Sequence, residues 1–363
     1  MKIGVVGLPN VGKSTLFNAI TEAGAECANY PFCTIEPNIG VVAVPDKRLA
    51  VLEKMYSARR VVPASIEFVD IAGLVKGASH GEGLGNKFLS HIRETDAIIM
   101  VVRCFDDENI INVSDSVDPV RDADIINTEL ALSDLESVEK RRAKFEKTVK
   151  SGDPKAVEAL KLLDRMTACL NEGKSLRTLK LSFEELATVD GQFLLSTKPI
   201  IYCANISESD IGKADNRYVD ALKEYARQDG AACIDICAKA EQEISALPKE
   251  ERGEYLEALG LSVSGLERVI TSGYELLGLM SFLTAGEKEV RAWTIERGTS
   301  APKAAGKIHT DFERGFIRAE IMSYDDLVAL GSAAAVKAAG KLRSEGKDYI
   351  MQDGDIVEFK FNV

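Results

Sequence analysis

The sequence contains no long apolar run, and this absence excludes a membrane-spanning helix. No stretch approaches the roughly 18–20 consecutive apolar residues that such a helix needs. Residues 2–6 already show a strand pattern, which leaves no space for a leader peptide ahead of them. We therefore expect a cytoplasmic protein without a membrane partner.

Paired cysteines and clustered histidines are also missing. The chain has seven cysteines, an odd number without paired spacing, and only three histidines. Cys233 and Cys237 lie four residues apart without a second pair of ligands, so we interpret them as core thiols rather than zinc ligands. Unpaired cysteines of this kind are typical of a reducing compartment.

The chain also lacks an excess of positive charge. The 45 lysines and arginines face 57 aspartates and glutamates, which gives a net charge of −12. This balance argues against nucleic-acid binding over the whole surface, and we expect no DNA partner. A local basic face on one domain remains compatible with it.

What the chain does contain is a phosphate-binding loop close to its first residue. The segment Gly7–Ser14 has the form G-x-x-x-x-G-K-S and stands between a strand pattern at residues 2–6 and helical spacing at residues 15–20. Backbone N–H groups of such a loop surround a polyphosphate, Lys13 reaches the β- and γ-phosphates, and the Ser14 hydroxyl binds Mg²⁺. The alternative, a tight turn before an ordinary helix, leaves the complete motif unexplained.

Two further segments have the form of nucleotide-sensing switches. Asp70–Gly73 has the pattern D-x-x-G at the end of a predicted strand, so Asp70 would hold Mg²⁺ through water and the Gly73 N–H would sense the γ-phosphate. Thr34 lies in a loop bounded by two prolines, where a switch threonine completes the Mg²⁺ shell. A capping aspartate is the alternative interpretation of Asp70, and its register with the phosphate loop disfavours it.

The position after D-x-x-G lacks the usual catalytic glutamine. It holds Leu74, which cannot orient water, so hydrolysis is expected to be slow or to use a polar group from elsewhere. His80 is a candidate because it lies in the glycine-rich stretch that follows. An exposed loop histidine without a catalytic role is the commoner explanation.

The base-recognition loop differs from that of guanine-binding proteins. Those proteins use N-K-x-D, whose aspartate accepts two hydrogen bonds from guanine, whereas Asn205–Glu208 retains asparagine but places Ile206 and Glu208 at the other two positions. The longer carboxylate cannot occupy the same place, and adenine needs no such acceptor. Ala238 and Lys239 match the loop that lies behind the base.

The order of the predicted elements indicates the fold class. Short apolar strands alternate with helices, which predicts an α/β fold with a mostly parallel sheet covered on both faces. The strands are expected at 2–6, 38–44, 66–70, 97–102, 198–204 and 232–237. The length of 363 residues favours two or three domains.

Two accessory modules interrupt or follow this core. Charged, helix-forming residues 125–150 and an amphipathic stretch with Val157, Leu163 and Leu170 on one side predict an antiparallel coiled-coil hairpin. Its outer surface is either a solvated face or a docking arm. The tail predicts a small α+β domain, with strands at 290–295 and 316–321, a loop at Ala301–Gly306, a helix at 324–330 and a last strand ending at 361.

In combination, these residues resemble the Obg-like ATPases of the YchF subfamily over essentially the whole chain. The tail resembles the TGS domain of that subfamily. The segments that carry the resemblance are Gly7–Thr15, Asn29–Asn38, Asp70–Gly77, Gly81–Asn86, Asn205–Glu208, Arg291–Thr294 and Ala304–Phe312. The expected domains are a P-loop G domain over 1–275, interrupted by the helical insertion at 120–195, and a TGS domain over 279–363.

The resemblance implies a site and a function. Phosphates would be held by Asn10, Val11, Gly12, Lys13, Ser14 and Thr15. Mg²⁺ would be held by Ser14 and Thr34, and adenine by Asn205 with the Ile206 backbone. It further implies slow hydrolysis of ATP in preference to GTP, K⁺ as a candidate activator, and association with the ribosome through rRNA or a ribosomal protein. We expect a monomer.

Other functions remain open at this point. A switch that prefers GTP, a phosphotransferase acting on a small substrate, and a non-catalytic scaffold stabilised by nucleotide would each use the same phosphate loop. The two switch-like segments disfavour a phosphotransferase. Comparing the affinities for ATP and GTP separates the first alternative from the ATP-selective switch, and detectable hydrolysis excludes the scaffold.

Overall fold

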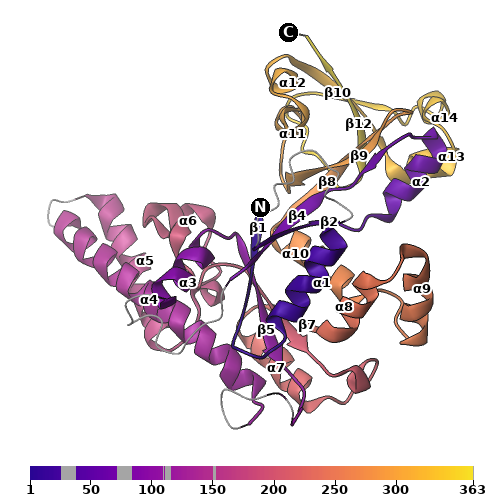
Figure 1. The fold of residues 1–363 in the computed structure, drawn as a ribbon. Coiled ribbons are helices and arrows are strands. Elements are labelled where there is room, and N and C mark those ends of the chain that lie inside the picture. Colours follow the sequence, from indigo (N-terminus) through magenta and orange to yellow (C-terminus); the bar gives the residue numbers. More distant parts are fainter. Residues whose placement is uncertain (26–37, 72–83, 109, 111–115, 150–152, 363) are drawn as a thin grey trace. The chain divides into compact units, whose positions relative to one another are not determined.

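The computed structural model describes residues 1–25, 38–71, 84–108, 110, 116–149 and 153–362 (Figure 1). These residues form two compact units. Unit 1 contains residues 1–25 and 38–40 and the described part of 67–269, and unit 2 contains residues 41–66 and 270–362. No helix in the described part of the chain combines the length and apolar character that crossing a membrane requires.

A six-stranded sheet with the order β2-β4-β1-β5-β6-β7 forms the centre of unit 1. Strand β1 pairs in parallel with β4 and β5, β5 with β6, and β6 with β7. The bounds are β1 (Lys2–Gly7), β2 (Ile39–Ala43), β4 (Ser65–Asp70), β5 (Ala97–Arg103), β6 (Ile200–Asn205) and β7 (Ala232–Ile236). This arrangement confirms the predicted α/β fold class.

Helices cover both faces of this sheet, which explains its continuous apolar strands. Every residue of β5 and β6 is buried. Helices α1 and α8 pack together on one face, and α4 and α7 lie against the other (Figure 1). The shorter helices are α1 (Lys13–Ala25), α3 (Leu84–Arg93), α7 (Arg217–Gln228), α8 (Ala238–Ala246), α9 (Lys249–Ala258), α10 (Gly265–Leu276) and the single turn η3 (Glu208–Asp210).

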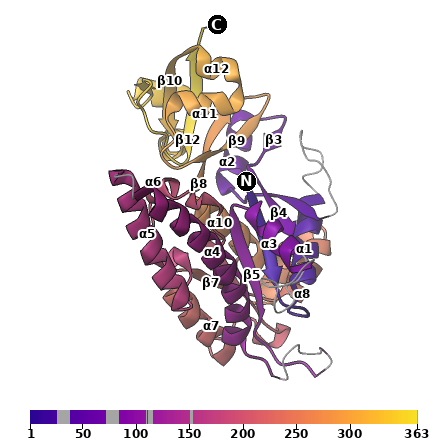
Figure 2. The same ribbon diagram turned by 90° about the vertical axis from the view of Figure 1, so that its left-hand side faces the viewer.

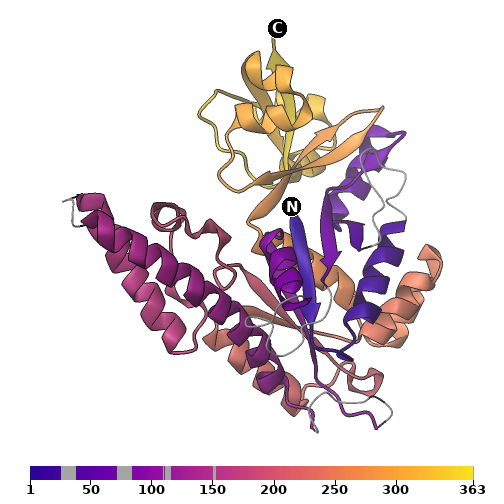
Figure 3. The same ribbon diagram turned by 60° about the vertical axis from the view of Figure 1, so that its left-hand side comes forward.

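The predicted helical hairpin is present and lies between β5 and β6 in the chain. Helices α4 (Pro119–Val149) and α5 (Pro154–Asn171) run side by side (Figures 2 and 3). Their shared core includes Val138, Leu163 and Met166. The predicted apolar face was wrong at Val157, whose exposed fraction is 39%, because the adjacent Ala156 occupies the buried position.

A buried carboxylate ties α4 to the chain that returns from the hairpin. The side chain of Asp134 accepts hydrogen bonds from Leu195 N at 2.8 Å, Ser196 N at 2.7 Å and Ser196 Oγ at 2.6 Å. The returning chain forms η1 (Leu176–Leu179), α6 (Phe183–Thr188) and η2 (Gly191–Phe193). Asp134 therefore fixes the end of this segment against the hairpin before β6 begins.

Unit 2 has its own six-stranded sheet with the order β11-β10-β12-β8-β9-β3. Helices α11 and α12 pack against this sheet over a core that includes Phe282, Ala304 and Phe359 (Figure 2). The strands are β3 (Val61–Val62), β8 (Leu279–Ala285), β9 (Val290–Glu296), β10 (Phe316–Ser323), β11 (Arg343–Glu345) and β12 (Asp355–Phe361). The helices are α2 (Lys47–Tyr56), α11 (Ala301–Ile308), α12 (Thr310–Arg314), α13 (Tyr324–Leu330) and α14 (Ala333–Ala338).

The prediction of a loop at Ala301–Gly306 was wrong, because this segment opens helix α11. Pro302 lies in the first turn, where a missing N–H costs no helical hydrogen bond. Ala301, Ala304 and Ala305 form a fully buried face against the sheet. Tertiary burial of small side chains thus decides the conformation of a segment whose proline and glycine suggested a loop.

Candidate functional site

The loop between β1 and α1 has positive φ angles only at residue types that tolerate them. Asn10 has a φ of 63° and Gly12 a φ of 92°, both in the left-handed region that asparagine tolerates and glycine adopts without strain. Helix α1 begins at Lys13, and Leu16 N donates to Gly12 O at 3.0 Å. The N–H groups of residues 13–15 have no partner within the helix, which is the arrangement that binds phosphate at a helix N-terminus.

Two glycines allow this loop to pack closely against its neighbours. A Cβ at Gly7 would lie 2.8 Å from both Val101 O and Val11 Cγ2. A Cβ at Gly12 would collide with the side-chain amide of Asn205. The glycines of the motif therefore serve the packing of the loop as well as its backbone conformation.

Lys13 and Asp70 form an ion pair that joins the phosphate loop to the end of β4. Both side chains are largely buried, with exposed fractions of 11% and 25%. The pairing follows from the parallel sheet, because β1 and β4 are neighbours and end at the same edge. The sequence motif and the fold thus bring together the predicted phosphate-binding lysine and the predicted metal-binding aspartate.

The donor atoms at this edge suit Mg²⁺ held jointly with a nucleotide. Ser14 follows Lys13 directly and supplies a hydroxyl, and Asp70 supplies a carboxylate, both of which are oxygen ligands that Mg²⁺ prefers. Among the described residues, no group of three or more histidine, cysteine, aspartate or glutamate side chains could hold a metal ion. The residues therefore fit an ion that completes its shell with water and phosphate oxygens.

Asn205, the last residue of β6, braces three segments of the site. Its side chain is buried; Nδ2 donates to Val11 O at 2.9 Å, and Oδ1 accepts from Ala238 N at 3.0 Å. Its backbone O accepts from Cys104 N at 2.8 Å. The amide of Asn205 therefore holds the phosphate loop and the start of α8 in position, a role that the motif alone does not reveal.

The remaining base-loop residues follow directly after this brace. Ile206 is buried, and its N–H donates to Ile236 O at 2.9 Å. Glu208 lies in η3, where its Oε2 accepts from Lys239 Nζ of α8 at 2.7 Å. This hydrogen bond and the charge of Glu208 raise the pKa of Lys239 above its usual range. The carboxylate at the guanine-recognition position is thus already engaged by a cation of the same site.

Three of the predicted catalytic residues lie outside the described residues. These are Thr34, Gly73 and His80. Their roles in metal binding, phosphate sensing and water activation stay predictions. The described part of the site contains Lys13 of the catalytic set and all the residues predicted to bind nucleotide.

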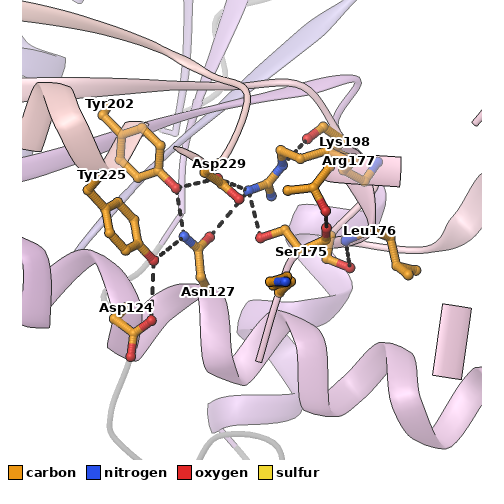
Figure 4. Close-up of polar contacts among 12 residues, drawn as sticks. Asp124, Asn127, Ser175, Leu176, Arg177, Lys198, Tyr202, Tyr225 and Asp229 are labelled. Atoms are coloured by element: carbon orange, nitrogen blue, oxygen red, sulfur yellow. Dashed lines mark hydrogen bonds and ion pairs between the residues drawn. The ribbon is translucent and has the colours of Figure 1, made fainter. Parts of the chain in front are cut away.

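A buried polar network supports the strand that precedes the base loop (Figure 4). No sequence motif predicts this network. Arg177 of η1 pairs with Asp229 at 2.5 Å, and both side chains are less than one-tenth exposed. The hydroxyl of Tyr202 in β6 donates to Asp229 at 2.6 Å, and Asn127 of α4 donates to Tyr202 at 2.6 Å and to Tyr225 at 3.0 Å. Tyr202 lies three positions before Asn205 in β6, so the network fixes this strand against the first turns of α4.

Burial determines the protonation of the two tyrosines in this network. It raises the pKa of Tyr225 to about 12 and that of Tyr202 well above its usual range. Both hydroxyls therefore keep their protons at neutral pH. Tyr202 can then donate to the Asp229 carboxylate, which also receives the Arg177 guanidinium.

Two family models match separate parts of the chain. A family described as 50S ribosome-binding GTPase matches residues 2–140. The YchF-GTPase C-terminal family, described as a protein of unknown function, matches residues 279–362. The first match contains the phosphate loop and Asp70, and the second matches most of the C-terminal part of unit 2.

Full-length relatives extend this likeness over the whole chain. The ribosome-binding ATPase YchF of Bacillus subtilis is 53% identical over 361 residues, covering 99% of each chain. That of Escherichia coli O157:H7 is 53% identical over 362 residues, covering 100% of this chain and 99% of the relative. The solved YchF GTPase of Schizosaccharomyces pombe is 42% identical, with a TM-score of 0.89 over 99% of this chain and 97% of that one.

Proposed function

The chain belongs to the YchF family, and from this premise we propose that it is a nucleoside triphosphatase that binds ATP in preference to GTP. Hydrolysis is slow, requires Mg²⁺ and serves as a switch for association with the ribosome. The names of the bacterial relatives support the ribosome as the partner and the cytoplasm as the location. The expected domains are part of this proposal, including a TGS domain at 279–363.

The observation that carries the nucleotide preference is the pairing of Glu208 with Lys239. Guanine recognition needs a carboxylate that accepts from both N1–H and the 2-amino group. Glu208 is one methylene longer than the aspartate that does this, and its Oε2 accepts a hydrogen bond from Lys239. Adenine has no 2-amino group and an unprotonated N1, so it loses nothing at such a site.

The residues around the phosphates have separate tasks. Lys13 supplies the charge that neutralises the β- and γ-phosphates, and the N-terminus of α1 supplies backbone N–H groups. Ser14 and Asp70, with Thr34, would hold Mg²⁺, which neutralises charge on the bridged phosphate oxygens. Leu74 replaces the residue that orients water in related GTPases, so a low intrinsic rate follows.

Conformational switching would depend on the segments that contain Thr34 and Gly73. Groups that contact the γ-phosphate and Mg²⁺ lose those partners on hydrolysis, so the surface that they form changes with the nucleotide. We assign His80 as a candidate water-orienting group and K⁺ as a candidate activator. The protein acts as a monomer in this proposal, with ATP and ADP as its alternating ligands.

Equilibrium titration with fluorescent ATP and GTP in the presence of Mg²⁺ tests the preference. We expect a lower Kd for ATP by at least about tenfold, which corresponds to about 1.4 kcal/mol. Tighter binding of GTP would overturn the adenine assignment and favour a GTP-dependent switch. Tight ATP binding without any phosphate release, with ribosomes and K⁺ present, would favour a nucleotide-stabilised scaffold instead.

A further inference from the structure

Unit 1 has a hollow of about 640 Å³ between helices α5 and α7. Arg165, Ala168 and Cys169 line it from one face of α5. Tyr225 and Gln228 line it from one face of α7. Small-molecule sites in proteins measure roughly 300–1,000 Å³, so the hollow is large enough for a ligand. None of the residues predicted to bind nucleotide lines it, and it is therefore a separate site.

The charged side chains of this hollow leave Asp124 without a cation. The two cations of the lining already have acidic partners. Lys174 lies 2.8 Å from Glu172, and Arg165 lies 3.3 Å from a glutamate of α6. Asp124 is an exposed residue of α4 and forms no ion pair within the part of the chain that the structure describes. Its negative charge is therefore available to a bound cation.

The ends of two helices and the charge of unit 1 add to the negative potential of the hollow. Helix α5 ends at Asn171 and is followed by the lining residues Glu172 and Gly173, and α7 ends at Gln228. The carboxyl end of a helix carries a partial negative charge, which favours a cation. In unit 2, 17 lysines and arginines balance 16 aspartates and glutamates, so the net charge of −12 resides on unit 1. An acidic surface of this kind raises the local concentration of cations.

The other lining residues indicate an organic cation rather than a metal ion. Among the described residues, no group of three or more histidine, cysteine, aspartate or glutamate side chains could hold a metal. Ala168 and Leu179 supply apolar surface, which suits methylene groups. Ser175 and Gln228 supply oxygen atoms that can accept hydrogen bonds from an ammonium group. This combination of acidic, polar and apolar groups fits an aliphatic amine.

We propose that the hollow between α5 and α7 binds an aliphatic diamine or polyamine. One ammonium group pairs with Asp124, a second contacts acceptors at the ends of α5 and α7, and the methylene chain between them lies against the apolar lining. Two ammonium groups are required because the acceptors belong to different helices. Tyr225 and Asp229 line the hollow and also belong to the network around Tyr202 (Figure 4). The amine therefore binds beside the residues that support β6.

Isothermal titration calorimetry of the full-length protein without nucleotide tests the proposal with three matched probes. Cadaverine has two ammonium groups on a chain of methylenes, pentylamine lacks one of these groups, and free lysine is cadaverine with a carboxylate added. We expect cadaverine to bind at a single site. Pentylamine should bind about tenfold more weakly, because it loses one set of charge-assisted hydrogen bonds. Free lysine should also bind at least about tenfold more weakly, because its carboxylate meets the negative potential of the hollow.

Two variants locate the bound amine. Asp124→Asn removes the charge and keeps an oxygen that can accept from the Tyr225 hydroxyl, so cadaverine should bind about tenfold more weakly. Ala168→Lys adds a tethered ammonium at an exposed lining position of α5 and should abolish cadaverine binding. The matched control is Asp164→Asn, which removes a half-exposed carboxylate of α5 outside the hollow. This control should bind cadaverine as the wild type does.

Other outcomes would overturn this assignment. Absence of cadaverine binding to the wild type at millimolar concentrations would show that the hollow is not an amine site. Equal losses in Asp124→Asn and Asp164→Asn would show that amines bind only to the general negative charge of unit 1. Equal affinity for pentylamine would identify a site for a single ammonium group, and tighter binding of free lysine would identify a site for a zwitterion. Normal cadaverine binding by Ala168→Lys would place the amine outside the hollow.

Discussion

At the scale of single residues, Lys13 is the group on which phosphate binding most depends. Its ammonium already pairs with Asp70 at the edge of the sheet, so it is held where the phosphates are expected. We predict that Lys13→Ala weakens ATP binding by at least about 100-fold, because charge-assisted hydrogen bonds contribute about 1.5–3 kcal/mol each. Fluorescent-nucleotide titration measures this, and the control is Lys47→Ala, which removes an exposed lysine of α2. Unchanged affinity would contradict the assignment.

Substitution of Asn205 is expected to act differently, because its side chain is hydrogen-bonded to the protein backbone. Asn205→Ala leaves Val11 O and Ala238 N without their partners, which costs about 1–3 kcal/mol. We expect a lower Tm and weaker binding of ATP and GTP by similar factors, measured by calorimetry and titration. A selective loss of ATP binding would show that the amide contacts adenine directly.

The base loop itself is tested by rebuilding the guanine pattern. We predict that Ile206→Lys combined with Glu208→Asp raises the GTP affinity relative to ATP. Lys239→Met, which releases the Glu208 carboxylate, should shift the ratio in the same direction by about two- to fivefold, the range of an exposed ion pair. If both variants keep the wild-type ratio, selectivity originates elsewhere in the pocket.

The sequence predicts that the phosphate loop and Asp70 belong to one site, because each is recognised from a short local motif. The pairing of Glu208 with Lys239 could not be predicted, since it joins residues 31 positions apart through the fold. The same holds for Arg177 and Asp229, which are separated by 52 positions. Side-chain partners across such separations depend on packing that no short pattern encodes.

At the scale of elements, the hairpin and the parallel strands were predictable from hydrophobic periodicity. Strand β5 is apolar from Ala97 to Val102 and is buried throughout. Helix α11 was not, because Gly306 inside it disfavours a helix and Pro302 is typical of loops, although in the first helical turn it costs no hydrogen bond. Its alanine face gains enough from burial against the sheet of unit 2 to outweigh that local preference.

Substitution of Asp134 tests how the helical hairpin is attached to the returning chain. It is buried and accepts three hydrogen bonds from residues 195 and 196. We predict that Asp134→Ala costs about 3 kcal/mol, because it leaves buried donors unpaired. A fall in Tm of several degrees, measured by calorimetry, is expected.

The matched control is Asp164→Ala in α5, whose carboxylate lies 2.7 Å from Arg142 and is half exposed. Exposed pairs of this kind contribute about 0–1 kcal/mol. Its Tm should therefore stay close to that of the wild type. Equal effects of the two variants would show that Asp134 is not an anchor for the returning chain.

At the scale of the whole molecule, the chain combines a strongly acidic nucleotide-binding unit with a second unit of balanced charge. Residues 41–66 belong to the second unit through contacts with distant segments, such as the pairing of β3 with β9 and of Arg48 with Asp353. No local pattern predicts this association, because it joins residues more than 200 positions apart. The difference in charge between the two units predicts that the binding of a charged partner weakens as the salt concentration rises.

The central claim is that ATP controls association with the ribosome, and co-sedimentation tests it most directly. Purified protein and ribosomes are centrifuged through sucrose with ATP, a non-hydrolysable ATP analogue, ADP, GTP or no nucleotide, each with Mg²⁺ at equal concentration. The account predicts that the bound fraction differs between the ATP-analogue and ADP states, and that GTP at limiting concentration does not reproduce the effect of ATP. The same bound fraction under all five conditions would contradict it.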